Sequence, residues 1–195
     1  SNPYEGNIDE LAIYNNYLLT PEQILAHYQA GTNANYGTNY ETLVLTAPFP
    51  GPTGVPGPQR QGPKTYLRFN DPAYYPATNS GTVGYLANAS QVVTTNTVAG
   101  PQPPTYAGFE PSNLAVPLDG LKQWANLNNP SGLNISGQIT LEAWVKPDAL
   151  QGDTARIISH GPPTRTDYLV APPAGAVTNS SEVFLGLDGA GANYV

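Results

Sequence analysis

Few side chains in this sequence have the type and spacing that chemistry requires. Glu142 and Trp144 alternate along QITLEAWVKP, so both lie on one face of a strand, and a carboxylate beside an indole ring could contact a sugar. A carboxylate pointing to solvent beside a tryptophan that packs in the core gives the same pattern, and we favour this interpretation. Trp124, after the turn in VPLDGLKQW, is the second residue that could contact a sugar.

The residues needed for catalysis are not gathered in any segment. A nucleophilic site needs a nucleophile beside a base, but the chain has two isolated histidines, His27 and His160, with no cysteine and no G-x-S-x-G motif. Glycoside hydrolysis needs a pair of carboxyl groups, whereas the alternate neighbours of Asp9 in EGNIDELAI are asparagine and leucine. We expect no enzymatic activity and interpret both histidines as surface or packing residues. A glycanase that depends on Glu142 stays open as a third hypothesis.

Three segments match the acceptor pattern for N-linked glycosylation, which requires Asn-x-Ser or Asn-x-Thr with x other than proline. They are NAS at Asn88, NIS at Asn134 and NSS at Asn179, whereas NPS at Asn129 is blocked by its proline. These three asparagines are the predicted modification sites, on condition that the source glycosylates its secreted proteins.

The positioning elements begin with a helix, which LTPEQILAHYQAG predicts over about residues 21–30. Thr20 suits the N-cap, Gln23 three residues later completes a capping box, and Gly31 supplies a C-terminal stop. The apolar stripe by which this helix would dock consists of Ile24, Leu25 and Tyr28.

Several strands are predicted around this helix from alternating side chains. NIDELAIY places Leu11 and Ile13 on an inward face and residues 10, 12 and 14 on the other face. QITLEAWVKP is the clearest strand, with an apolar face formed by residues 139, 141, 143 and 145. A further strand is predicted in TYLRFND, where Tyr66 and Arg68 alternate with Leu67 and Phe69. Other strands are predicted in NLAVPLD, RIISH and EVFLGLD.

Two of these stretches carry a family resemblance. YEGNIDELAIYNNYLLTPEQILAHY resembles the C-terminal end of a laminin-G-like domain of the concanavalin-A-like lectin/glucanase class, and SGLNISGQITLEAWVKPDA with ARIISHG resembles a strand pair near the start of such a domain. The resemblance implies an all-β fold, an antiparallel jelly-roll β-sandwich with one short helix at about 21–30. The resemblance also implies a candidate Ca²⁺ site in the loops that hold Asp71, Asp119 and Asp188. We favour the alternative interpretation, in which the Asp-Gly sequences simply form turns. We therefore expect no cofactor.

The order of the two stretches predicts an unusual organisation. The stretch that resembles the C-terminal end of the domain comes before the stretch that resembles its start. We expect residues 1–31 to be the closing strand and helix of one unit, 32–64 a Pro/Gly-rich linker, and 65–195 the N-terminal part of a laminin-G-like sandwich. The chain would then be a piece of a longer or processed protein. Three arrangements stay open: a cut through a tandem array, circular permutation within one chain, and completion of one chain's sandwich by its neighbour.

Composition restricts the partners. The net charge of -7, with only 11% charged residues, disfavours nucleic acids and anionic membrane surfaces, and no apolar run approaches the ~18 residues that span a membrane. Low charge and 13 tyrosines indicate an extracellular or cell-surface protein. We expect a structural or adhesive repeat unit, with identical subunits or neighbouring repeats as partners in a fibre or tandem array. The alternative is a carbohydrate-binding module of a larger secreted protein, with glycans as ligands.

Overall fold

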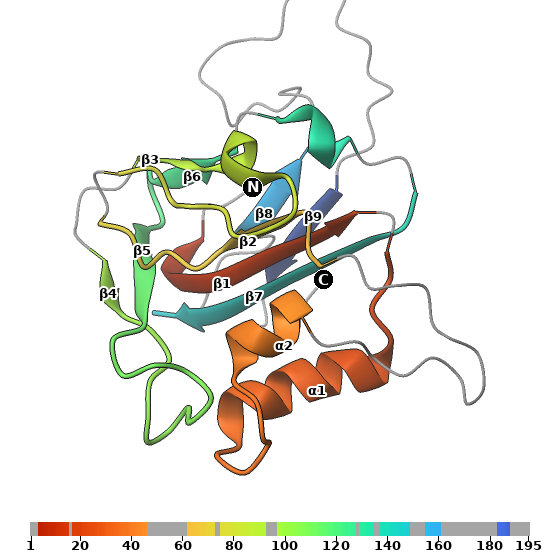
Figure 1. Ribbon diagram of the computed structural model, residues 1–195. Coiled ribbons are helices and arrows are strands. Elements are labelled where there is room, and N and C mark those ends of the chain that lie inside the picture. The colour runs from red at the N-terminus through yellow and green to blue at the C-terminus, as the bar shows by residue number, and fades with distance from the viewer. Residues whose placement is uncertain are drawn as a thin grey trace, which may run out of the picture.

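The computed structural model describes residues 4–15, 17–46, 62–72, 75–92, 97–127, 129–134, 137–148, 155–160 and 183–187. It is rich in antiparallel strands (Figure 1). The strands are β1 (Glu5–Asn15), β2 (Thr65–Leu67), β3 (Ser90–Val92), β4 (Val98–Ala99), β5 (Leu114–Asp119), β6 (Trp124–Asn126), β7 (Ile139–Pro147), β8 (Ala155–His160) and β9 (Val183–Leu187). The helices are α1 (Pro21–Thr32) and α2 (Tyr40–Thr46), with short 3-10 turns η1 (Gly84–Ala87) and η2 (Ser131–Leu133).

Strand β1 is the centre of the main sheet. Along one edge it pairs with β5 through residues 5–8 and with β2 through residues 11–13, and along the other edge it pairs with β7 from Gly6 to Asn15. Strand β4 extends the sheet beyond β5. Every residue from Ile8 to Asn15 is buried, so β1 is covered on both faces rather than on the single inward face that the sequence predicts.

A bulge in β1 explains how its side chains are distributed. The register with β7 shifts between Asp9 and Ala12, and Glu10 has a positive φ of 53°. The extra residue places Ile8 in the same core cluster as Leu11 and Ile13. Because bulges redirect side chains, the two carboxylates at the bulge become buried polar groups within an otherwise apolar strand.

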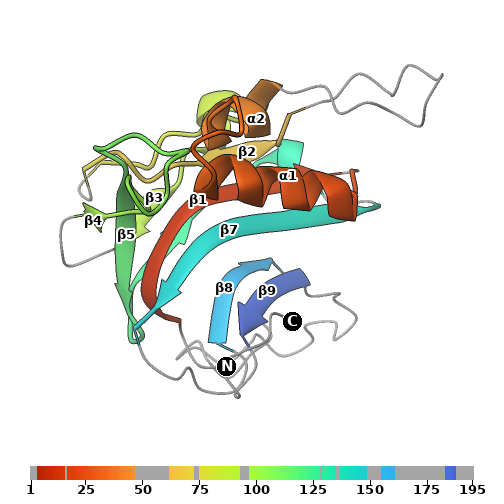
Figure 2. The ribbon, with the colours of Figure 1, turned by 90° about the horizontal axis from the view of Figure 1, so that it is seen from below.

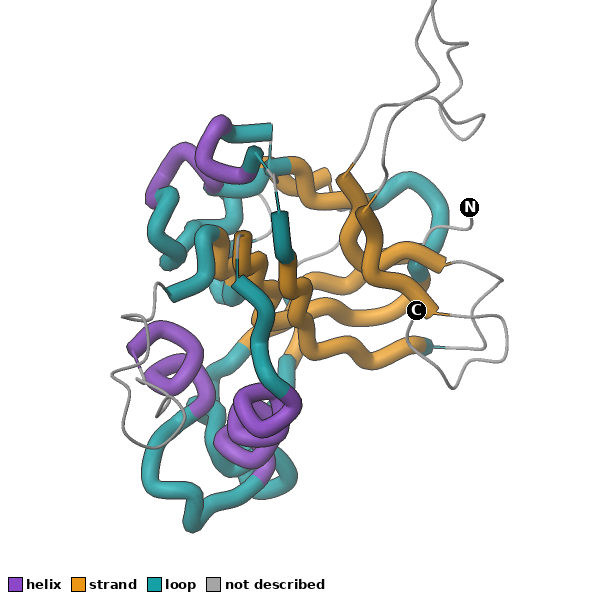
Figure 3. The backbone as a smooth tube through the Cα atoms, turned by 90° about the vertical axis from the view of Figure 1, so that its right-hand side faces the viewer, coloured by secondary structure: helices purple, strands orange, loops and turns teal. Residues whose placement is uncertain are grey.

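The main sheet lies between two sets of elements. Figure 2 shows α1 and α2 over one face of β1 and β7, and the β8–β9 hairpin over the opposite face; Figure 3 shows the two helices together beside the strands. On the helix side, the core contains Ala12, Tyr14, Leu19, Tyr40, Val44, Tyr66 and Phe109. On the hairpin side, Ile157 and Ile158 of β8 pack against a cluster that includes Ile8, Leu11, Ile13, Leu67 and Phe69.

Alternate side chains of β7, and of β2 with the residues that follow it, lie in the two different core clusters, as the sequence predicts. Residues 139, 141, 143 and 145 of β7 pack on the hairpin side, while Trp144 packs on the helix side. In the segment from Tyr66 to Phe69, Leu67 and Phe69 take the hairpin side and Tyr66 the helix side.

Helix α1 has the predicted cap but not the predicted docking face. Thr20 Oγ1 accepts a hydrogen bond from Gln23 N, and Gln23 Oε1 accepts one from Thr20 N, which confirms the capping box. The expected stripe of Ile24, Leu25 and Tyr28 is wrong, because each of these side chains is more than half exposed. The buried residues of the helix are Gln23, Ala26, His27, Ala30 and Gly31.

Small residues and one polar pair decide which face of α1 docks. Ala26, Ala30 and Gly31 let the helix approach its neighbours closely, and a Cβ on Gly31 would lie 2.7 Å from the Trp144 ring. Gly31 is therefore a packing residue inside the helix, not its stop; the helix continues to Thr32, and Asn33 caps it.

A second helix, α2, lies within residues 32–64, for which a linker is predicted. The prediction of one short helix in the whole chain is therefore wrong. Tyr40, Leu43 and Val44 of α2 are buried in the helix-side clusters. Residues 47–61 of the expected linker lie outside the described part of the chain. Residues 4–46, which we call the N-terminal segment, thus supply the central strand and both α-helices of the described fold.

Candidate functional site

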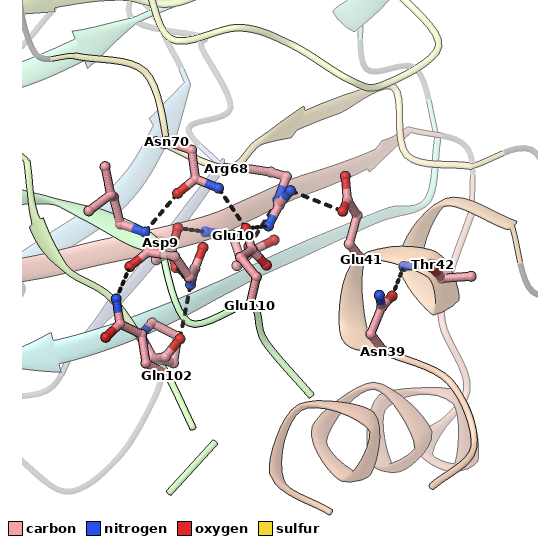
Figure 4. A network of polar contacts seen from close by, with 12 residues as sticks. Asp9, Glu10, Asn39, Glu41, Thr42, Arg68, Asn70, Gln102 and Glu110 are labelled. Carbon is pink, nitrogen blue, oxygen red and sulfur yellow. Dashed lines mark hydrogen bonds and ion pairs between the residues drawn. The ribbon is translucent and has the colours of Figure 1, made fainter. Parts of the chain in front are cut away.

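The first polar cluster surrounds Arg68, which follows β2. Its guanidinium contacts three carboxylates: Nε donates to Glu10 Oε1 at 3.2 Å, Nη1 lies 2.9 Å from Glu41 Oε2, and Nη2 donates to Glu110 (Figure 4). These come from β1, α2 and the loop before β5. Only 18% of the Arg68 side chain is exposed. The arginine joins three separate segments of the chain.

The carboxylate of Glu10 is the most deeply buried part of this cluster. Its side chain is fully buried, and the Tyr66 hydroxyl donates to its Oε2. Burial raises the pKa of Glu10 from its ordinary value of 4.5 to about 7, against the opposing effects of the Tyr66 hydrogen bond and the Arg68 charge. Proton binding at Glu10 therefore falls within the physiological pH range.

The neighbouring Asp9 has partners different from those of Glu10. Its Oδ2 accepts from Asn113 Nδ2 at 2.6 Å, and its Oδ1 accepts from the backbone N–H of Glu10 at 2.8 Å. Burial, and next the charge of Glu10, raise the pKa of Asp9 well above its ordinary value. Two adjacent residues of β1 thus have carboxyl groups that burial makes costly to ionise.

The second polar cluster is centred on Glu142 of β7. His27 Nδ1 of α1 lies 2.9 Å from Glu142 Oε2, and the Tyr40 hydroxyl of α2 donates to Glu142 Oε1 at 2.6 Å. The Glu142 and His27 side chains are 19% and 1% exposed. Burial, and then the Glu142 carboxylate, raise the pKa of Tyr40 well above its ordinary value. The expectation that Glu142 points to solvent is wrong, because its carboxylate contacts His27 and Tyr40 under the helices. His27 is buried and is thus a packing residue, one of the two alternatives expected for it.

Aromatic rings surround Trp144 beside this cluster. Tyr28 stacks on the indole with centroids 6.0 Å apart, and Tyr106 meets it edge to face at 5.7 Å. The buried rings of Phe109 and Tyr40 lie nearly perpendicular to it, with centroids 5.1 and 5.7 Å away. Because Tyr28 and Tyr106 are exposed, the tryptophan lies at the boundary between core and surface.

A shallow pocket of about 270 Å³ lies next to this aromatic group. Asn33, Thr38 and Asn39 line it with the backbone of Gly108, which packs against Ala30 and Gly31. Asn33 and Asn39 accept backbone hydrogen bonds through Oδ1, while within the described part of the chain their Nδ2 groups donate to no other residue. The pocket offers neutral polar groups and no charge.

The two tryptophans proposed for sugar contact lie in different sheets. Trp124 of β6 is half exposed in the small β3–β6 sheet, whereas Trp144 lies in the main sheet beside β1. They do not form one platform, and the exposed aromatic neighbours of Trp144 are Tyr28 and Tyr106.

The predicted glycosylation sites differ in their surroundings. Asn134 is exposed after η2. Asn88 is half-buried, and its Oδ1 accepts from the backbone N–H of Asn79 at 2.8 Å. Asn179 lies outside the described residues.

Asp71 and Asp119, two of the three candidate Ca²⁺ ligands, each accept hydrogen bonds from their own surroundings. Asp71 accepts from the backbone N–H and hydroxyl of Thr78, and Asp119 accepts from the N–H groups of residues 121 and 122 in the turn after β5. Asp188 and the side chain of His160 lie outside the described residues. Among the residues that the structure describes, no group of three or more His, Asp or Glu side chains is arranged to hold a metal ion.

Both polar clusters escape prediction from sequence. Arg68, Glu10, Glu41 and Glu110 come from segments far apart along the chain, and Glu142 is 115 residues from His27. One local signal is present: the alternation places Arg68 on the strand face opposite Leu67. If that face is buried, the charged side chain must have a partner there.

Comparisons with protein-family models, curated proteins and solved structures find no match for this chain. No helix in the described part of the structure is long and apolar enough to cross a membrane.

Proposed function

We propose that this chain is a structural or adhesive module of an extracellular protein, a laminin-G-like jelly-roll sandwich whose N-terminal segment completes its sheet. The same segment can complete the sheet of a neighbouring copy, so that like modules join head to tail. The observation that carries the proposal is the position of β1, which pairs with β2, β5 and β7 at once.

The sheet depends on β1 for its continuity. In the described sheet, β2, β5 and β7 each pair with β1, and β1 lies between β7 and the other two. Without β1 these strands would present unpaired N–H and C=O groups, which favour pairing with another chain. An identical β1 from a second copy offers the same hydrogen bonds, and a contact between two different surfaces of like subunits propagates.

Composition supports the extracellular setting. The chain is poor in charge, carries three sequons and has no cysteine. Its described polar clusters join structural elements, and this arrangement favours a scaffold over an enzyme.

Exchange of the segment can be tested by mixing two single-cysteine variants, because the natural chain has no cysteine. Asn7 of β1 is the register partner of Lys146 of β7. Paired residues of antiparallel strands have Cα atoms about 4.5–5.5 Å apart, which a disulfide can span. Asn7→Cys chains unfolded and refolded together with Lys146→Cys chains should form a disulfide-linked dimer on oxidation.

The matched control pairs Asn7→Cys with Tyr85→Cys, since Tyr85 is 80% exposed on η1 and is no partner of β1. Dimer from the register pair but not from the control pair supports exchange. Equal low yields from both pairs would show that each β1 stays in its own chain and would overturn the assembly proposal.

A second candidate function is carbohydrate binding, favoured by the exposed rings of Tyr28 and Tyr106 around Trp144 beside the neutral polar pocket. Aromatic faces and uncharged hydrogen-bonding groups suit a sugar ring. A glycan array tests this function: selective binding that Tyr28→Ala abolishes and Tyr75→Ala preserves would support it, and no bound glycan would contradict it.

A further inference from the structure

We propose that Arg68 and Glu142 form a two-point lock that selects the N-terminal segment of a like chain as the partner of the sheet. This inference rests on the proposed exchange of that segment and specifies what the exchange recognises. The partner is a segment that presents carboxylates to Arg68 and a histidine with a tyrosine to Glu142.

The two anchors share one arrangement. Arg68 contacts Glu10 of β1 and Glu41 of α2. Glu142 contacts His27 of α1 and Tyr40 of α2. Each anchor lies outside the N-terminal segment and holds two of its residues, which come from two different elements. The anchors differ in charge, so the segment must offer acidic groups at one point and hydrogen-bond donors at the other.

Side chains, not the backbone ladder, must supply the selectivity. Any extended segment can make the ladder hydrogen bonds, and a shift of two residues keeps each side chain on its original face. Such a shift displaces a side chain by about 6.8 Å along the strand, too far for Glu10 to remain bonded to Arg68. The lock therefore excludes a register that the apolar pattern of β1 would tolerate.

Burial makes each anchor costly to leave unmatched. The side chains of Arg68 and Glu142 are 18% and 19% exposed, and Glu10 and His27 are nearly or fully buried. A buried charge that loses its partner destabilises more than the pair itself stabilises. A generic apolar strand would leave Glu142 without His27 and Tyr40, and Arg68 with Glu110 as the one carboxylate that remains of its three. This penalty favours a like chain over an unrelated one.

The lock can be tested in the cysteine exchange experiment by competition between two donors. The acceptor carries Lys146→Cys, and equal amounts of two Asn7→Cys donors compete for it, one natural at its anchor contacts and one carrying Glu41→Gln with His27→Gln. Mass spectrometry separates the two crosslinked products. Glu41→Gln removes the negative charge that faces Arg68, and His27→Gln removes the imidazole that contacts Glu142. Together these changes should reduce the altered donor's share about tenfold or more.

Two further donors keep the test independent of donor folding. Glu41→Gln alone changes a partly exposed residue and should give an intermediate reduction, while Glu5→Gln changes an exposed residue of β1 and should compete equally. Equal incorporation of all donors would overturn the lock while leaving exchange intact. No crosslink from any donor would overturn the exchange itself, and with it the lock between chains.

Discussion

Replacing Glu10 by glutamine should remove a large part of the pH dependence of folding stability. The Glu10 carboxyl is buried, and its pKa in the folded chain is about 7 compared with 4.5 for an ordinary glutamate. The folded state therefore binds this proton more tightly than the unfolded state. The stabilising contribution is fully present below pH 4.5 and is lost as pH rises through about 7.

The magnitude follows from the difference between the two pKa values. Folding raises the pKa of Glu10 from 4.5 to about 7, and each pKa unit corresponds to about 1.36 kcal/mol. The free energy of unfolding should therefore fall by roughly 3 kcal/mol between pH 4.5 and pH 8. Asp9 acts in the same direction, because burial also raises its pKa. Glu10→Gln removes the Glu10 contribution and part of the Asp9 shift, since the Glu10 charge is the second cause of that shift.

Urea unfolding followed by tryptophan fluorescence at pH 5, 6, 7 and 8 measures this effect. The natural chain should become less stable as pH rises, and the Glu10→Gln chain should show a flatter dependence. Glu5→Gln, at an exposed position of the same strand, should retain the natural slope. Equal slopes in the natural and Glu10→Gln chains, or a natural chain that is more stable at pH 8 than at pH 5, would contradict a raised pKa at Glu10.

Four further substitutions test the packing of α1, each by thermal or urea unfolding. Gly108→Ala places a Cβ 1.6 Å from the backbone oxygen of Ala30, so it should prevent normal folding or cost more than about 3 kcal/mol; natural stability would contradict the Gly108–α1 contact. Thr20→Ala should cost about 1 kcal/mol through loss of the helix cap. Leu25→Ser should change stability by less than about 0.5 kcal/mol because Leu25 is exposed, and a larger loss would restore the stripe as the docking face. Trp144→Ala should cost roughly 3 kcal/mol as four aromatic neighbours lose their contact, whereas a loss below about 1 kcal/mol would show that the ring is peripheral.

The elements that sequence predicts well are those with a strong local signal. The alternation from residue 139 to 147 predicts β7 and its two faces, and the capping box at Thr20 and Gln23 predicts the start of α1. In both cases neighbouring residues carry enough information, because strand period and helix caps are local properties.

The docking face of α1 is predicted wrongly because a distant contact decides it. Ile24, Leu25 and Tyr28 are the more apolar residues, but His27 pairs with Glu142, and the small residues beside it allow close approach. Helix α2 escapes prediction for a similar reason. Seven residues form a helix mainly through tertiary packing, and Tyr40 is fully buried in that packing.

The candidate site is the part least accessible from sequence. The bulge that buries Glu10 depends on the pairing of β1 with β7, and Arg68 meets Glu10 because β2 pairs with β1. Neither strand pairing can be recognised from the residues next to Glu10 or Arg68 in the sequence. Sequence predicts that Tyr66 and Arg68 share a face, and it gives no sign of what covers that face.

The most direct test of the central role of β1 uses one chain that carries both Asn7→Cys and Lys146→Cys. Oxidation at several concentrations, followed by non-reducing electrophoresis and thiol titration, measures whether the two positions meet. We expect both thiols to be lost. In dilute solution the product should be a closed monomer, and during refolding at rising concentration it should be a lengthening ladder of covalent oligomers. Thiols that stay free at every concentration would contradict the position of β1 beside β7, and disulfides in monomer alone would contradict exchange between chains.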